Sequence, residues 1–167
     1  NLSTSIQRLL SSNYFRVYTN NDIMGVEIAG AMKNVISIAS GVCIGLGFGD
    51  NTIAALVSRG LNEILRLGHH FKAPASTFYG LAGVGDLAVT AFSRHSRNRE
   101  FGIAIGKGEI SSDCIRKSDM VVEGYYTSKA LQAIIDKNNL DMPISDQIYS
   151  ILYEDLCPKE AIISLIT

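Results

Sequence analysis

The chain has 167 residues, of which 47% are hydrophobic and 19% are charged, so it is long enough to bury a core of its own. Its formal net charge of -1 provides no basic field, which argues against nucleic acid or an anionic membrane surface as a partner. The three cysteines, Cys43, Cys114 and Cys157, include no C-x-x-C pair, and we expect reduced thiols and a cytoplasmic location.

The first 20 residues differ in pattern from the rest. A Thr4-x-x-Gln7 capping signature predicts a short helix over 3–10, and the aromatic and β-branched run at 14–19 predicts one β-strand. This strand has no evident partner in the sequence, and the composition changes at 20–22. Because the chain also begins in polar sequence without a methionine, we expect it to be a fragment of a longer protein.

After residue 22 the pattern predicts helices only. The stretch from Ile23 to about Gly45 is apolar on nearly all sides, as in a central helix, and its uncharged part is shorter than the ~20 apolar residues of a membrane span. Asp50 and Asn51 predict the cap of a second helix that ends near Gly68. Caps and first-turn prolines predict further helix starts at Asp86, Ser96, Thr127, Pro143 and Pro158. We therefore predict an all-α helical bundle.

Two glycine clusters, at 45–49 and 80–85, resemble loose phosphate-binding loops. Neither follows a predicted strand, so helix ends and close helix packing explain them better than a dinucleotide-binding fingerprint does. His69 and His70 lie far from His95 in the sequence, and no cysteine or carboxylate stands at ligand spacing from them. We predict no metal site.

The segment 92–102 brings Arg94, Arg97 and Arg99 together with Ser96 and Asn98 at a predicted helix start. Free backbone N–H groups and the helix dipole favour an anion at such a start, and a guanidinium can hold a phosphate through two hydrogen bonds. A solvated, charged turn is the alternative interpretation. The segment is therefore a candidate anion site.

Four further polar residues complete the candidate site. Asp86 and Thr90 stand one helical turn apart on the same face, just before the arginine cluster. Lys33 in an apolar helix either extends its ammonium group to the surface or lies desolvated, where it could serve as a proton donor. Asn34 could donate a hydrogen bond to a substrate oxygen or be an exposed amide. Glu123 could cap a helix or recognise a ribose or amide group.

Five segments of the chain resemble one known family, in order and with natural spacing. They are GVEIAGAMKNVISIASG, LVSRGLNEILRLG, YGLAGVGDLAVTAFSRHSRNREFG, VVEGYYTSKAL and MPISDQIYSILYE. Together they span nearly the whole chain and look like the C-terminal domain of bacterial NAD(P)-dependent glycerol-3-phosphate dehydrogenase.

The resemblance implies a helical substrate domain over 21–167, of the 6-phosphogluconate dehydrogenase C-terminal-like type. It also implies that 1–20, with one helix and one strand, is a remnant of a dinucleotide-binding domain. The family's glycine-rich fingerprint is absent here, so NAD or NADP would be bound mainly by that missing domain, and the fragment alone would be inactive. The implied reaction interconverts dihydroxyacetone phosphate and sn-glycerol 3-phosphate by hydride transfer, in glycerophospholipid precursor synthesis.

The resemblance assigns roles to particular residues as well. Lys33 resembles the catalytic lysine, which exchanges a proton with the C2 oxygen of the substrate as the hydride moves. The positions that match the substrate site are Lys33, Asn34, Asp86, Thr90, Ser96, Arg97 and Asn98, and those that match the cofactor's edge are Arg97, Val121 and Glu123. The implied partners are the small-molecule substrates and a second copy in a homodimer, with no nucleic acid and no membrane span.

Two alternatives stay open at this point. A relative that acts on another hydroxy acid, such as 6-phosphogluconate, would also use a lysine on a central helix. A helical interaction module with no chemistry of its own would need only the apolar helices. The sequence leaves the preference between NAD and NADP open, and also the oligomeric state.

Overall fold

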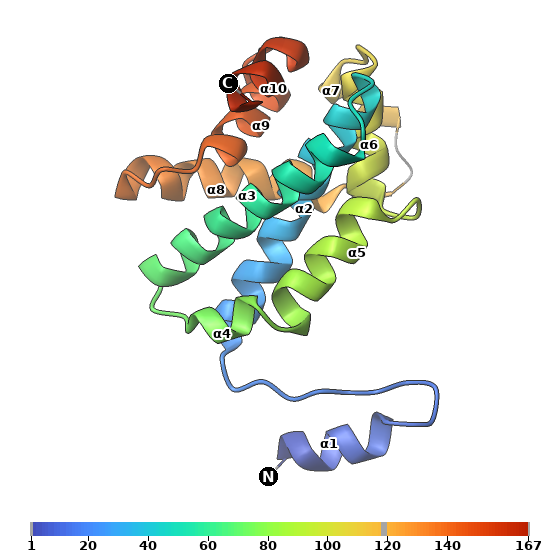
Figure 1. Ribbon diagram of the computed structural model, residues 1–167, viewed down its shortest axis with the longest axis vertical. Helices are drawn as coiled ribbons and strands as arrows, with labels where there is room; N and C mark the ends of the chain where they lie inside the picture. Colours follow the sequence, from blue (N-terminus) through green and yellow to red (C-terminus); the bar gives the residue numbers. More distant parts are fainter. Residues whose placement is uncertain (1, 118–119, 167) are drawn as a thin grey trace.

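The computed structural model describes residues 2–117 and 120–166, and every regular element within them is helical (Figure 1). The predicted all-α fold is therefore confirmed. In chain order the elements are α1 (Leu2–Leu10), α2 (Ile23–Gly45), α3 (Asp50–His70), α4 (Ala75–Phe78), the π-helical turn η1 (Leu81–Gly85), α5 (Asp86–Phe92), α6 (Arg97–Gly106), α7 (Ser111–Lys117), α8 (Glu123–Asn138), α9 (Pro143–Tyr153) and α10 (Pro158–Ile166).

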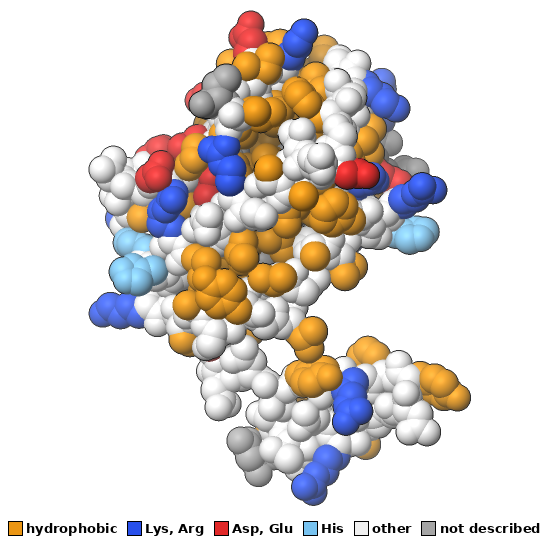
Figure 2. Space-filling view, viewed as in Figure 1, with side chains coloured by type: hydrophobic (Ala, Val, Ile, Leu, Met, Phe, Trp, Pro, Cys, Tyr) orange, Lys and Arg blue, Asp and Glu red, His pale blue; other side chains and the backbone are white. Residues whose placement is uncertain are grey.

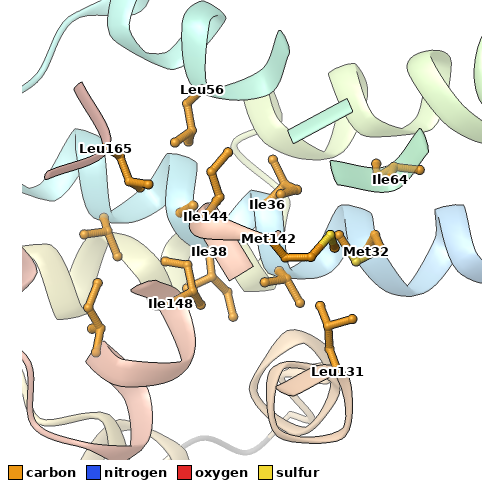
Figure 3. Close-up of a cluster of buried hydrophobic side chains, with 14 of the residues drawn as sticks. Met32, Ile36, Ile38, Leu56, Ile64, Leu131, Met142, Ile144, Ile148 and Leu165 are labelled. Carbon is orange, nitrogen blue, oxygen red and sulfur yellow. The ribbon is translucent and has the colours of Figure 1, made fainter. Parts of the chain in front are cut away.

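The centre of the fold is α2, which packs against α3, α5, α6, α8 and α9. Figure 3 shows its side chains meeting those of the surrounding helices, and the labelled residues of this cluster are Met32, Ile36, Ile38, Leu56, Ile64, Leu131, Met142, Ile144, Ile148 and Leu165. By length and composition alone α2 could cross a membrane, but 72% of its most apolar window is buried inside the protein. The predicted central helix is thus present, with the predicted bounds.

The most extensive helix contact among the described elements joins α2 to α6, and glycines allow the two backbones to approach closely. A Cβ atom added at Gly102 would lie 2.2 Å from the carbonyl oxygen of Ile38, and one added at Gly45 would lie 2.4 Å from that of Ile103. In the second glycine cluster, a Cβ atom at Gly83 would lie 2.0 Å from the carbonyl oxygen of Phe78. Close packing therefore accounts for Gly45 and Gly83, as the sequence indicated, whereas a Cβ atom added at Gly47 or Gly49 would meet nothing within 4 Å.

The N-terminal segment is the part of the chain that the sequence predicted least well. Figure 1 shows α1 and the extended chain after it beside one end of the helical body. The strand predicted at 14–19 is not formed: the segment is extended, and the described residues offer it no neighbouring strand. Thr4 and Gln7 lie inside α1 rather than at its cap, and Gln7 Nε2 instead donates to the carbonyl of Val17 at 2.8 Å. A strand needs a partner to satisfy its backbone groups, and a local pattern cannot supply one.

Some predicted helix starts are confirmed and others are wrong. Ser96 caps α6 through the N–H of Arg99, and Pro143 and Pro158 are the first residues of α9 and α10. Asp50, however, is the first residue of α3 rather than its cap, because Gly49 takes that position.

The start of α8 was misplaced for a physical reason. We predicted it at Thr127, but α8 begins at Glu123. The N–H of Gly124, in the first turn, donates to Asn98 Oδ1 of α6 at 2.9 Å. This cap comes from another helix, and no pattern within the segment itself can reveal it.

Candidate active site

Lys33 and Asp86 form the charged centre of the site. The Nζ atom of Lys33 on α2 lies 2.5 Å from Oδ2 of Asp86, the first residue of α5. The side chains are 24% and 41% exposed, so the pair is partly sheltered but reachable by a ligand. Asp86 was predicted to cap a helix, and its carboxylate instead binds the lysine. The sequence left open an ammonium group at the surface and a desolvated one, and the partly exposed Lys33 lies between these two alternatives.

Asp86 also faces a hollow in the protein. A pocket of about 640 Å³ lies between the segment 18–20, the first turns of α2, and the α4–η1 region, and Asp86 forms part of its wall. Thr90, one turn further along α5, donates to the Asp86 carbonyl at 2.7 Å. The predicted placement of Asp86 and Thr90 on one face is confirmed.

A chain of amides connects α8, α6 and α2 next to this pair. Gly124 N donates to Asn98 Oδ1 at 2.9 Å, and Asn98 Nδ2 donates to Asn34 Oδ1 at 3.0 Å. Asn34 Nδ2 in turn donates to Glu123 Oε2 at 3.1 Å and to the carbonyl of Gly30 at 3.2 Å. Both asparagines are buried, while Glu123 is exposed at the start of α8. The structure thus brings Asn34, Asn98 and Glu123 together.

Two buried serines of α2 hold the neighbouring helix ends. The hydroxyl of Ser37 donates to the carbonyl of Thr90 at 3.0 Å and lies 2.9 Å from the hydroxyl of Ser96. Ser40 donates to the carbonyl of Ala91 at 3.0 Å. Neither serine was predicted to matter, although Ser37 stands four residues after Lys33, on the same face of α2.

Arg97 and Val121 are placed less centrally. Arg97 is the first residue of α6 and is exposed, and it lines a second pocket of about 250 Å³ together with Lys117 and Val122. Val121 is 62% exposed just before α8. Arg97 and Asp86 therefore line different pockets.

A third carboxylate, Glu63 of α3, was not predicted to matter and is 2% exposed. It accepts hydrogen bonds from the N–H groups of Ile144 and Ser145 and from the Ser145 hydroxyl, at 2.5, 3.1 and 2.7 Å. Burial raises the pKa of this carboxyl above its ordinary value, although the three hydrogen bonds act in the opposite direction. Burial likewise raises the pKa of Cys43 to about 11, so this thiol is unreactive.

On the face shown in Figure 2, acidic and basic side chains are interspersed around a broad area of hydrophobic ones. Within 2–117 and 120–166 we find no group of three or more histidine, cysteine or carboxylate side chains that could hold a metal ion.

Comparison with known proteins identifies the family of the chain. Residues 22–163 match the family described as NAD-dependent glycerol-3-phosphate dehydrogenase C-terminus. The glycerol-3-phosphate dehydrogenase [NAD(P)+] of Carboxydothermus hydrogenoformans is 51% identical over 162 residues, which are 97% of this chain and 48% of that protein. The enzyme of the same name from Halothermothrix orenii is 49% identical over 96% of this chain and 48% of its own length.

Solved structures agree. The crystal structure of glycerol-3-phosphate dehydrogenase from Coxiella burnetii superimposes with a TM-score of 0.95 at 39% identity, over 99% of this chain and 51% of that one. The yeast enzyme superimposes with a TM-score of 0.87 at 29% identity, over 95% of this chain and 46% of that one. The chain spans about half the length of the relatives it matches. It belongs to the family of glycerol-3-phosphate dehydrogenase C-terminal domains.

Proposed function

We propose that this chain is the substrate-binding half of an NAD(P)-dependent oxidoreductase that interconverts dihydroxyacetone phosphate and sn-glycerol 3-phosphate, and so supplies the precursor of glycerophospholipids in the cytoplasm. The observation that carries the proposal is the pair of Lys33 and Asp86, 2.5 Å apart at the edge of a pocket, in a chain of this family. A cation held beside an accessible pocket suits a reaction that develops negative charge on oxygen.

Lys33 is the proposed catalytic residue. In the reducing direction the C2 carbonyl carbon receives a hydride, and the carbonyl oxygen gains negative charge. The ammonium group of Lys33 stabilises that charge and then gives its proton to the oxygen, which becomes the hydroxyl group of glycerol 3-phosphate. Asp86 holds the ammonium group in place, and in the oxidising direction the neutral amine takes the proton back.

The phosphate group of the substrate would bind at the start of α6. Ser96, Arg97 and Asn98 are the cap and first two residues of that helix, where backbone N–H groups and the helix dipole favour an anion. Arg97 adds an exposed guanidinium group that can hold phosphate oxygens in a bidentate manner. With Asn34 and Thr90 nearby, binding energy from the phosphate would fix the C2 carbon for hydride transfer.

The cofactor, NAD or NADP, supplies or accepts the hydride when bound. The residues on this chain fit its edge: Arg97 and Lys117 line one pocket and offer positive charge to phosphate groups. The exposed Val121 offers an apolar surface, and the exposed Glu123 offers a hydrogen-bond acceptor. We propose that a dinucleotide-binding domain, of which residues 1–20 are the last part, binds most of the cofactor, and that the domain 21–167 is inactive without it.

The test is a substrate comparison in the full-length protein that carries this chain. We expect NADH or NADPH oxidation with dihydroxyacetone phosphate, and reduction of NAD or NADP with glycerol 3-phosphate. Turnover of 6-phosphogluconate at a higher kcat/KM than glycerol 3-phosphate would replace the proposed substrate with a hydroxy acid. No turnover of either substrate would favour an interaction module. Sedimentation of the same protein would test the proposed homodimer.

A further inference from the structure

The amide chain between α8 and α2 has a fixed direction. A backbone N–H can only donate a hydrogen bond and a backbone carbonyl can only accept one. The backbone groups at the two ends of the amide chain therefore determine how the side-chain amides between them are oriented. Because Gly124 N donates to Asn98, the oxygen of Asn98 must face α8 and its nitrogen must face Asn34. Because Gly30 O accepts from Asn34, the nitrogen of Asn34 must face away from Asn98.

Both ends therefore require the same orientation of both amides. Neither asparagine can turn its amide over without placing two donors or two acceptors against each other. With Asn98 8% and Asn34 6% exposed, water has little access to repair such a mismatch. The amide chain ends at Glu123, whose carboxylate accepts the remaining N–H of Asn34.

Glycine at position 124 lets α8 approach closely enough for this contact. A Cβ atom there would lie 2.7 Å from Ile38 Cδ1, 2.8 Å from the carbonyl oxygen of Asn34 and 2.9 Å from Asn98 Oδ1. A larger residue would push the start of α8 away from α2. The close approach and the amide chain thus depend on the same few atoms.

We propose that Asn98 is a positioning residue: held by the backbone N–H of Gly124, it fixes the amide of Asn34 beside Lys33 and, through Asn34, the carboxylate of Glu123. Asn98 thereby sets the register between the catalytic lysine on α2 and the start of α8. The proposal deepens the proposed function and rests on it for the meaning of Lys33 and Glu123. It adds a task that a ligand-binding role for Asn98 would not require, because the amide chain exists without any ligand.

The variant that tests the chain is Asn98→Asp, because it changes one polar group and almost no volume. When ionised, the introduced carboxylate still accepts from Gly124 N, but it places a second acceptor against Asn34 Oδ1. When protonated, its O–H can donate to Asn34 and restore the original pattern. The loss of stability and activity, and their recovery, should therefore follow the protonation of the carboxyl group introduced at position 98.

The measurements are the thermal midpoint without ligands and kcat/KM with dihydroxyacetone phosphate, in the full-length protein from pH 8 to pH 5. At pH 8 we expect Asn98→Asp to lower the midpoint by about 5 °C and kcat/KM by about 10-fold or more. Both differences from the unsubstituted protein should shrink by about half or more towards pH 5 as the buried carboxyl takes up a proton.

At each pH the variant is compared with the unsubstituted protein, so the titration of neighbouring groups that both proteins share largely cancels. These are Glu123 of α8, the Lys33–Asp86 pair of α2 and α5, and Arg97 and Arg99 beside Asn98 on α6, and both proteins contain them all. The matched control is Asn62→Asp, which makes the same change on the exposed face of α3. It should show neither difference.

Each other outcome overturns the proposal in a recognisable way. A lower kcat/KM with an unchanged midpoint would make Asn98 a ligand-binding residue alone. A lower midpoint with an unchanged kcat/KM would make the amide chain purely structural. Differences that stay constant from pH 8 to pH 5 would mean that the polarity of the amide is not what matters.

Two further readouts keep the test decisive. If the unsubstituted protein has no dehydrogenase activity, the proposed function fails, while the midpoint still tests the amide chain. If Asn98→Asp does not fold, Glu123→Gln serves instead, because its amide oxygen can still accept from Asn34. The amide chain then predicts an unchanged midpoint, and a fall of about 5 °C would contradict it.

Discussion

Two carboxylates on neighbouring helices, Glu63 and Asp86, show how a buried structural polar group differs from one at the proposed active site. Glu63 is 2% exposed and its oxygens receive three hydrogen bonds from the start of α9. The Asp86 side chain is 41% exposed, pairs with Lys33 and lines a pocket. Burial of charge therefore does not mark the site here. The proposed site is marked instead by exposure to a pocket and by a charged partner, Lys33.

The largest effect should come from breaking the partly exposed Lys33–Asp86 ion pair. Lys33→Met in the full-length protein removes both the charge and the proton donor, and we expect kcat/KM to fall by roughly 10²–10⁴. Because the pair is partly exposed, its loss should change the free energy of unfolding by less than about 1 kcal/mol. Enzyme assays and urea unfolding measure the two quantities. Lys159→Met, on the exposed part of α10, is the control, and a variant at Lys33 that retained normal turnover would remove the proposed catalytic role.

Replacement of the buried carboxylate, Glu63, should have the opposite effect: a loss of stability with little change in kcat. Glu63→Ala leaves the N–H groups of Ile144 and Ser145 and the Ser145 hydroxyl without their acceptor, in a place that water does not reach. We expect the free energy of unfolding to fall by about 3 kcal/mol. At a temperature where the variant is still folded, kcat should be close to normal. A selective loss of kcat would instead place Glu63 in the active machinery.

The same contrast explains which features the sequence could reveal. The cap at Ser96 and the proline at the start of α9 involve residues adjacent in sequence, and both predictions were correct. Glu63 looked like an ordinary polar residue of an amphipathic helix, because the segment that buries it lies 81 residues further along the chain. The start of α8 was misplaced for the same reason.

The candidate site was found in part by pattern and in part by resemblance. The turn-apart placement of Asp86 and Thr90 follows from helix geometry, and the structure confirms it. The approach of Lys33 to Asp86, 53 residues away, depends on how α2 and α5 pack, which periodicity cannot give. Ser37 and Ser40 were missed because spacing along an apolar helix does not show which helix end a serine contacts, and these two contact residues 53 and 51 positions away.

Two serines on α2, Ser37 and Ser40, allow an effect on substrate binding to be separated from an effect on stability. Ser37→Ala and Ser40→Ala each remove one buried hydroxyl that donates to the last turn of α5, and each should lower the free energy of unfolding by about 1 kcal/mol. Only Ser37 also contacts Ser96, at the proposed phosphate site. We therefore expect a KM for dihydroxyacetone phosphate that rises in Ser37→Ala and stays unchanged in Ser40→Ala. Equal KM values would show that the contact with Ser96 does not influence substrate binding.

The smallest effect concerns pH and belongs to Glu63 again. Burial raises its pKa in the folded protein above the ordinary value of 4.5, so the folded state holds this proton more tightly than the unfolded state does. The resulting contribution to stability is complete below about pH 4.5 and is lost as the pH rises through the raised pKa. Glu63→Gln has no such proton, and it retains an acceptor for Ile144 N.

The informative quantity is the free energy of unfolding of the unsubstituted protein minus that of Glu63→Gln, measured by urea at a series of pH values. We expect this difference to decrease as the pH rises above 4.5 and to level off once Glu63 is ionised in the folded protein. Asp146, whose pKa is also raised by burial, is present in both proteins, so its own titration largely cancels. A difference that grew with pH would mean that the three hydrogen bonds outweigh burial, because charge-assisted bonds would then favour the ionised form more than desolvation opposes it.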